Sequence, residues 1–128
     1  MKEIIAIVRR HQVPASKKAL EEAGFNALTI QSVEGHGKQK GAGGWAAEVD
    51  PHLRPLLKHE MPVQDALMKW IPKRMLTLVV QDQEVDKAVE ALIRANQTGH
   101  IGDGKIFVCP LEEVLRVRTG ENGPRAVS

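Results

Sequence analysis

The chain has 128 residues, of which 42% are hydrophobic and 27% charged, and its formal net charge is +2. These values are typical of one soluble globular domain. The small charge and the scattered basic residues argue against a nucleic-acid-binding protein. The sequence has no apolar run long enough to span a membrane, no signal-peptide pattern, and only one cysteine, Cys109. We therefore expect a cytoplasmic protein without an internal disulfide.

Apolar periodicity predicts the order strand, helix, strand, insertion, strand, helix, strand. Gly24 is expected to end the first helix, and Asp82 to cap the second. This order predicts an α+β fold of the ferredoxin-like split βαβ type (βαββαβ), with both helices on one face of an antiparallel sheet. A short C-terminal strand at 114–120 and a flexible tail at 121–128 are expected. The strands are predicted at 3–9, 27–33, 75–81 and 105–109, and the helices at 14–23 and 85–94.

The insertion between the second and third strands is too long for an ordinary connection, which indicates a functional role. Its second half, 62–71, predicts a short amphipathic helix that begins at Pro62 and ends before Pro72. The apolar face of this helix would pack against its own domain or oligomer, or dock on a partner protein. The residues of this face are Val63, Ala66, Leu67, Trp70 and Ile71.

The segment "TGHIGDGKIFV" at 98–108 fits most of the P-loop pattern G-x-x-x-x-G-K. A P-loop follows a strand and opens a helix, whereas this segment follows a predicted helix and opens a strand. Ile106 also stands where the P-loop has Ser or Thr, so a Walker-type enzyme is excluded. The glycine N–H groups and the positive charge of Lys105 are nevertheless suited to bind an anion. The alternative is an ordinary turn with Gly99 as the helix C-cap.

Two further features of the sequence are suited to bind phosphate. The loop "GHGKQKG" at 35–41 brackets lysines and a glutamine with glycines. Arg116 and Arg118 would share one face of a strand and grip a single polyphosphate. Each feature alone also fits a solvated loop or strand edge, and together they favour an anion-binding site.

The stretches "GKQKG" (37–41), "TGHIGDGKIFV" (98–108) and "RVRTGE" (116–121) resemble the PII signal-transduction family. The resemblance covers nearly the whole chain except 42–69 and the tail. It implies a ferredoxin-like subunit in a compact homotrimer that binds ATP or ADP between subunits. It also implies that 2-oxoglutarate joins Mg²⁺-ATP at the base of the T-loop, here 36–73. The implied role is reporting nitrogen, carbon and energy state to target proteins, without catalysis.

The resemblance also implies roles for individual residues. Gln39 matches the ligand of Mg²⁺. The implied nucleotide-binding residues are Ile7, Thr29, Gly37, Lys38, Gln39, Val79, Gly102, Asp103, Gly104, Lys105, Arg116 and Arg118. The implied 2-oxoglutarate contacts are Gln39, Lys40, Gly41, Lys73 and Gly102.

The chain departs from the family pattern in three ways. Lys38 stands where many relatives have arginine, and Thr77 where many have glutamate near the adenine. The T-loop has no tyrosine, which excludes tyrosyl uridylylation. This long, tyrosine-free loop resembles the nitrogen-fixation-associated branch, whose members bind and inhibit nitrogenase.

Three alternatives stay open. The protein would regulate an ammonium transporter if Arg54 stood at the tip of the loop, or it would form a hetero-oligomer with a paralogous PII protein. A slow NTP phosphohydrolase is the alternative from another class of function. The residues expected to dock on a partner are Arg54, Val63, Leu67, Trp70 and Ile71.

Overall fold

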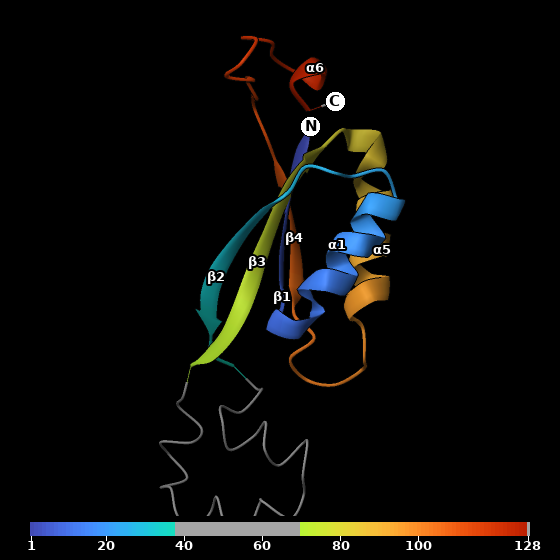
Figure 1. Cartoon of the computed structure of the whole chain (residues 1–128), viewed down its shortest axis with the longest axis vertical. Coiled ribbons are helices and arrows are strands. Elements are labelled where there is room, and N and C mark those ends of the chain that lie inside the picture. Colours follow the sequence, from blue (N-terminus) through green and yellow to red (C-terminus); the bar gives the residue numbers. More distant parts are fainter. Residues whose placement is uncertain (38–69, 128) are drawn as a thin grey trace, which may run out of the picture. The chain divides into compact units, whose positions relative to one another are not determined.

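The structure, a computed structural model, describes residues 1–37 and 70–127. These residues form a four-stranded antiparallel sheet in the order β2-β3-β1-β4 (Figure 1). The ferredoxin-like α+β fold predicted from the sequence is confirmed. The elements are β1 Lys2–Arg9, η1 Arg10–Gln12, α1 Val13–Glu22, β2 Thr29–Gly35, β3 Ile71–Val80, η2 Asp82–Glu84, α5 Val85–Asn96, β4 Lys105–Pro110 and α6 Pro124–Val127.

The chain divides into two compact units, one of Met1–Gln31 with Arg74–Ser128 and one of Ser32–Lys73. In the first unit, α1 and α5 lie side by side on one face of β1 and β4 (Figure 1). Alternate strand residues point toward these helices and are buried, as period-two patterning requires. The buried core consists of Ile4, Ala6, Val8, Leu20, Phe25, Leu76, Leu78, Val80, Ala88, Ala91 and Leu92.

The other face of the sheet carries a second row of side chains. In the register of β1 and β4, Ile5 lies opposite Phe107 and Ile7 lies opposite Lys105. Residues directly opposite each other in an antiparallel pair point to the same face. Phe107 is 48% exposed. An apolar pair and a lysine–isoleucine pair therefore lie together on the face away from the helices.

The helix ends differ in part from the sequence prediction. Gly24 follows α1 with a φ of 96°, and its N–H bonds to the Glu21 carbonyl, so its predicted role in ending the helix is confirmed. The predicted cap at Asp82 is wrong, because no side chain caps η2 or α5. The Asp82 carboxylate instead pairs with the amino group of Met1 at 2.9 Å.

The predicted helix 62–71 is wrong at its C-terminal end, because Ile71 begins β3. Pro72 explains the difference, since a residue before proline is driven from the α to the extended region. Trp70 precedes the strand and is 63% exposed. Residues 62–69 of the predicted helix lie outside the described residues.

The predicted C-terminal strand 114–120 is also wrong, since only one isolated bridge forms, between Leu115 and Asn122. The Arg116 N–H bonds to the Glu121 carbonyl at 2.8 Å, and the Gly120 N–H bonds to the Arg116 carbonyl at 2.7 Å. These bonds close a turn on Gly120, whose φ is 72°. The segment expected to be a flexible tail contains the helix α6.

Candidate functional site

The glycine loop, residues 97–104, connects α5 to β4. Gly99, Gly102 and Gly104 have φ values of 86°, 103° and 112°. Residues with a Cβ rarely adopt these conformations, so the backbone itself calls for glycine at all three positions. The alternative of Gly99 as the C-cap of α5 is wrong, because α5 ends at Asn96 and Gln97 is its cap.

Gly104 packs directly against the backbone of β1. A Cβ placed on Gly104 would lie 1.8 Å from the carbonyl oxygen of Ile7 and 3.0 Å from its carbonyl carbon. No side chain fits in that space. The next residue, Lys105, pairs with Ile7 in the sheet. The close approach therefore sets Lys105 beside Ile7 on the face away from the helices.

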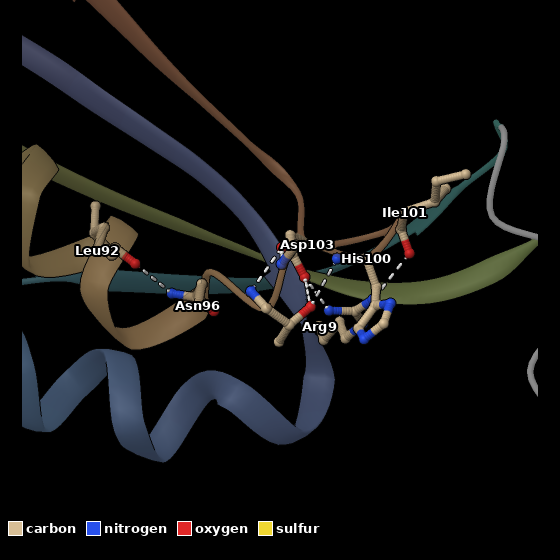
Figure 2. A network of polar contacts seen from close by, with 8 residues as sticks. Arg9, Leu92, Asn96, His100, Ile101 and Asp103 are labelled. Carbon is tan, nitrogen blue, oxygen red and sulfur yellow. Dashed lines mark hydrogen bonds and ion pairs between the residues drawn. The ribbon is translucent and has the colours of Figure 1, made fainter. Parts of the chain in front are cut away.

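Asp103 organises the loop (Figure 2). Its Oδ2 atom accepts hydrogen bonds from the N–H groups of Thr98 at 2.8 Å and Gly99 at 2.9 Å. Its Oδ1 atom accepts from the Thr98 hydroxyl and from Arg9 at the end of β1. A second nitrogen of Arg9 donates to the Ile101 carbonyl at 2.9 Å. The loop is thus closed on one carboxylate and tied to β1 by one guanidinium.

The charge state of Asp103 follows from these contacts. Partial burial disfavours its charged form, but the hydrogen bonds from Thr98, Arg9 and Gly99 outweigh burial and lower the pKa of Asp103 well below its usual range. The carboxylate is therefore ionised at neutral pH. Since it already accepts four hydrogen bonds, it is poorly placed to act as a general base.

A groove of about 470 Å³ runs beside the loop, between β4 and α5. Ile7, Asp103, Gly104 and Lys105 border one end of this groove, which lies on the helix side of the sheet, whereas the register turns the side chains of Ile7 and Lys105 to the opposite face. Lys105 is exposed and makes no ion pair within the described residues. A compact cation beside glycine N–H groups is an arrangement that suits phosphate.

Asn96 also lines the groove, at the C-terminal end of α5. Its side chain is only 7% exposed, and its amide nitrogen donates to the Ser16 hydroxyl at 2.8 Å and to the Leu92 carbonyl at 2.9 Å. Ser16 in turn donates to the Gln12 carbonyl at 2.8 Å. This chain of hydrogen bonds fixes the start of the glycine loop to α1.

The two arginines of the C-terminal turn lie in different environments. The Arg116 guanidinium pairs with Glu121 at 3.3 Å and donates to the Arg125 carbonyl at 2.9 Å. Arg118 lies in the turn 117–119 and is exposed. Because no strand forms here, the shared strand face inferred from their spacing does not exist.

The remaining predicted residues belong to other parts of the chain. Thr29 is exposed on β2, Val79 is half-buried on β3, Gly37 is exposed, and Lys73 on β3 is 7% exposed. The Lys73 stem packs near Gly35, where a Cβ would lie 3.5 Å from its Cγ. Outside the described residues lie Lys38, Gln39, Lys40, Gly41, Arg54, Val63 and Leu67.

The sequence reasoning missed Arg9, Thr98 and Asn96. Arg9 and Asp103 are 94 residues apart, and no local pattern connects them. Thr98 stands immediately before the first glycine of the loop, a position where a hydroxyl often bonds to nearby backbone, so it had a weak signal. Asn96 interrupts the apolar stripe of α5, and a polar residue on a buried face indicates a specific hydrogen-bonding role.

Within residues 1–37 and 70–127, no group of three or more His, Cys, Asp or Glu side chains is arranged to hold a metal ion. In the same ranges, no helix has the length and apolarity that crossing a membrane requires.

Comparison with known proteins places the chain in a family. Residues 1–121 match the family described as Nitrogen regulatory protein P-II. The chain is 42% identical over 127 residues to the nitrogen fixation nifHD region GlnB-like protein 2 of Methanobacterium ivanovii, covering 99% of each chain. It is 45% identical over 128 residues to the nifHD region glnB-like protein 2 of Methanococcus maripaludis, covering 99% of this chain and 100% of that one.

A solved structure agrees with the sequence matches. The crystal structure of Arabidopsis thaliana PII bound to citrate has a TM-score of 0.72 and 29% identity, covering 98% of this chain and 88% of that one. The family consists of signalling regulators and not of enzymes. The chain therefore belongs to the P-II family of nitrogen regulatory proteins.

Proposed function

We propose that this P-II protein binds ATP or ADP at the glycine loop and uses the bound state to signal nitrogen, carbon and energy status. The single observation that carries this proposal is the position of Lys105. Its ammonium-bearing side chain is exposed beside Ile7 on the sheet face away from the helices, next to the turn at Gly104. An apolar strand residue beside a lysine and a glycine turn suits a ligand with a flat base and a phosphate chain.

The residues implied by the family resemblance extend this site. Arg118 is exposed and would contact phosphate on a neighbouring subunit. Arg116 would join it if its contacts with Glu121 and Arg125 rearranged. Thr29, Gly37, Lys38, Gln39, Val79 and Gly102 complete the proposed nucleotide set.

A homotrimer would provide the neighbouring subunit. The sheet face away from the helices carries the apolar pair Ile5 and Phe107, and nearly half of the Phe107 surface is exposed, at 48%. A face of this kind is more stable when a second copy covers it. The hetero-oligomer with a paralogous PII protein is the second arrangement that the same face would allow.

We assign 2-oxoglutarate and Mg²⁺ to the base of the T-loop. Gln39 would hold the metal, and Lys40, Gly41, Lys73 and Gly102 would contact the effector. When bound, Mg²⁺ supplies a centre of positive charge for the oxygen atoms of both ligands. Among the described residues, the Asp103 carboxylate would not take part, because its oxygens already accept hydrogen bonds from Arg9, Thr98 and Gly99.

The proposed target is nitrogenase. Support comes from the relatives named for the nifHD region of nitrogen fixation. Binding would inhibit the enzyme through the T-loop, with Arg54, Val63, Leu67, Trp70 and Ile71 as docking residues. The exposed Trp70 ring, 63% accessible, offers an apolar contact at the end of that loop. An ammonium transporter is the alternative target.

Isothermal titration calorimetry tests the proposed ligands together. Because Gln39 would hold an Mg²⁺ ion whose charge serves both ligands, ATP and 2-oxoglutarate must each tighten the binding of the other by the same factor. We expect 2-oxoglutarate to bind strongly only when Mg²⁺-ATP is present, and Gln39→Ala to abolish its binding while ATP is only weakened. Equal binding of 2-oxoglutarate with and without Mg²⁺-ATP would refute the shared site.

A further inference from the structure

Arg9 makes a bridging contact that lies beside the proposed nucleotide site. It follows Ile7 by two positions on β1, and its Nη1 atom bonds to Asp103 while its Nη2 atom donates to the Ile101 carbonyl at 2.9 Å (Figure 2). The side chains of Arg9 and Asp103 are 13% and 23% exposed. A pair shielded from water to this degree is stronger and less screened by salt than an exposed pair.

The bridge has two physical consequences. It fixes two separate points of the glycine loop, the Asp103 side chain and the Ile101 backbone, to one rigid strand. It also balances the negative charge of Asp103, which lines the same groove as Lys105. Without a neighbouring cation, that carboxylate would repel the phosphates of a nucleotide.

Asp103 itself is directed inward, toward its own loop. Its two oxygens accept from Thr98, Gly99 and Arg9, so the carboxylate shapes the turn that begins two residues after α5. A carboxylate used in this way needs a cation on its remaining side. In the described residues that cation is Arg9, the partner in its one ion pair.

We infer that Arg9 is a positioning residue for nucleotide binding, acting through Asp103 and Ile101. It holds the glycine loop in its phosphate-receiving conformation and cancels the charge of Asp103. This inference rests on the proposed function, since it concerns the same site. It adds a residue that would not touch the ligand and assigns Asp103 to the loop and not to phosphate or metal.

The adjacent Arg10 offers a matched control. Arg10 begins η1 and is exposed, and the hydrogen bonds to Asp103 and Ile101 come from Arg9. Arg9→Met and Arg10→Met remove the same charge one residue apart. Any difference between them therefore reports the bridge and not the net charge of the protein.

The experiment measures ATP affinity by calorimetry in the wild type, Arg9→Met, Arg10→Met, Asp103→Asn and the Arg9→Met/Asp103→Asn double variant. We expect Arg9→Met to weaken ATP roughly 10–100-fold, because a charge-assisted contact and a loop anchor are lost. Arg10→Met should change affinity less than about twofold. The double variant should bind ATP more tightly than Arg9→Met alone, since the unbalanced charge is gone.

Amide resonances of Thr98 and Gly99 provide a second readout. In Arg9→Met both should shift relative to wild type, whereas in Arg10→Met they should not. Arg9→Lys keeps the charge but replaces the planar fork with a single ammonium, so its loss of affinity should be intermediate. This variant keeps the test decisive if Arg9→Met folds poorly.

The outcomes separate the two proposals. If the wild type fails to bind ATP, the proposed function fails and the positioning role with it. If the wild type binds ATP but Arg9→Met and Arg10→Met bind it equally well, only the positioning role is overturned. A double variant whose loss equals the product of the two single losses would also overturn it, because the residues would then act independently.

Discussion

Gly104 lies so close to Ile7 that a Cβ on the glycine would meet the Ile7 carbonyl oxygen at 1.8 Å. This contact joins the glycine loop to β1. It brings Lys105, which would bind phosphate, next to Ile7, which would contact the base. Gly104 also has a φ of 112°. The position therefore accepts only glycine for two reasons, the lack of space for a Cβ and the backbone conformation.

We predict that Gly104→Ala distorts the loop and removes ATP binding. The matched control is Gly99→Ala, because Gly99 also has a positive φ, 86°, but has nothing within 4 Å of an added Cβ. Gly99→Ala should destabilise the fold by about 1 kcal/mol, the cost of the backbone conformation alone. Gly104→Ala should cost about 2 kcal/mol or more in urea unfolding, because β1 must also move. Equal effects of the two substitutions would show that the contact with Ile7 is unimportant.

Asn96→Asp is predicted to destabilise the fold. The buried amide donates to Ser16 and to the Leu92 carbonyl, and a carboxylate would lose both bonds and bury a charge. The expected loss in the free energy of unfolding is about 2–4 kcal/mol. Asn26→Asp makes the same chemical change at an exposed position and should stay within about 0.5 kcal/mol of wild type. Similar urea midpoints for both variants would contradict the proposed role of the Asn96 hydrogen bonds.

The lowered pKa of Asp103 predicts a specific pH dependence of the free energy of unfolding. Its pKa is lower in the fold than in the unfolded chain, so its stabilising contribution is present above the unfolded pKa of about 3.9 and is lost as pH falls toward the folded value. Wild type should therefore exceed Asp103→Asn in stability at pH 7, and the difference should shrink as pH falls below about 4.

The measurement is the free energy of unfolding in urea from pH 7 to pH 3. Glu90→Gln serves as the control, because Glu90 is an exposed carboxylate on α5. That variant should follow the wild-type pH profile. A difference between wild type and Asp103→Asn that does not change with pH would contradict the role of the charge.

The sequence predicted the fold well because burial is periodic in β1 and α5. Ile4, Ala6 and Val8 alternate along the strand, and Ala88 and Leu92 fall on one face of the helix. The errors have local causes. Pro72 extends β3 back to Ile71, and the turn closed by Gly120 replaces the expected last strand.

The candidate site was less predictable than the fold. Sequence pattern identified the glycines and Lys105, since their spacing is local. It missed Arg9, because the contact with Asp103 spans 94 residues and depends on where β1 ends relative to the loop. The family resemblance implied that Asp103 binds the nucleotide, whereas its hydrogen bonds go to Thr98, Gly99 and Arg9.

Deleting residues 43–69 tests the proposed docking role of the T-loop. The described core is built mainly from side chains of β1, β3, α1 and α5. We therefore expect folding and ATP binding to persist while target binding is lost. Trp70→Glu should have the same effect on target binding, because Trp70 is exposed and contacts the His36 ring at a centroid distance of 5.5 Å. Leu67→Glu is the companion variant.

Binding of nitrogenase to immobilised wild type, deletion and point variants gives the readout, with thermal unfolding as the control for folding. If the charged variants unfold the protein or dissociate its oligomer, Leu67 and Trp70 belong to the protein's own core or oligomer contact, and the docking proposal fails. Retained nitrogenase binding by the deletion variant would place the target contact elsewhere on the protein.

The most direct test of the account is the dissociation constant of ATP for wild type and Lys105→Ala. Loss of the ammonium beside Ile7 should weaken ATP by about 1.5–3 kcal/mol, or roughly 10–150-fold. Lys18→Ala removes the same charge from an exposed position on α1 and should leave affinity within about twofold of wild type. An unchanged dissociation constant in Lys105→Ala would remove the glycine loop from the nucleotide site and contradict the central claim.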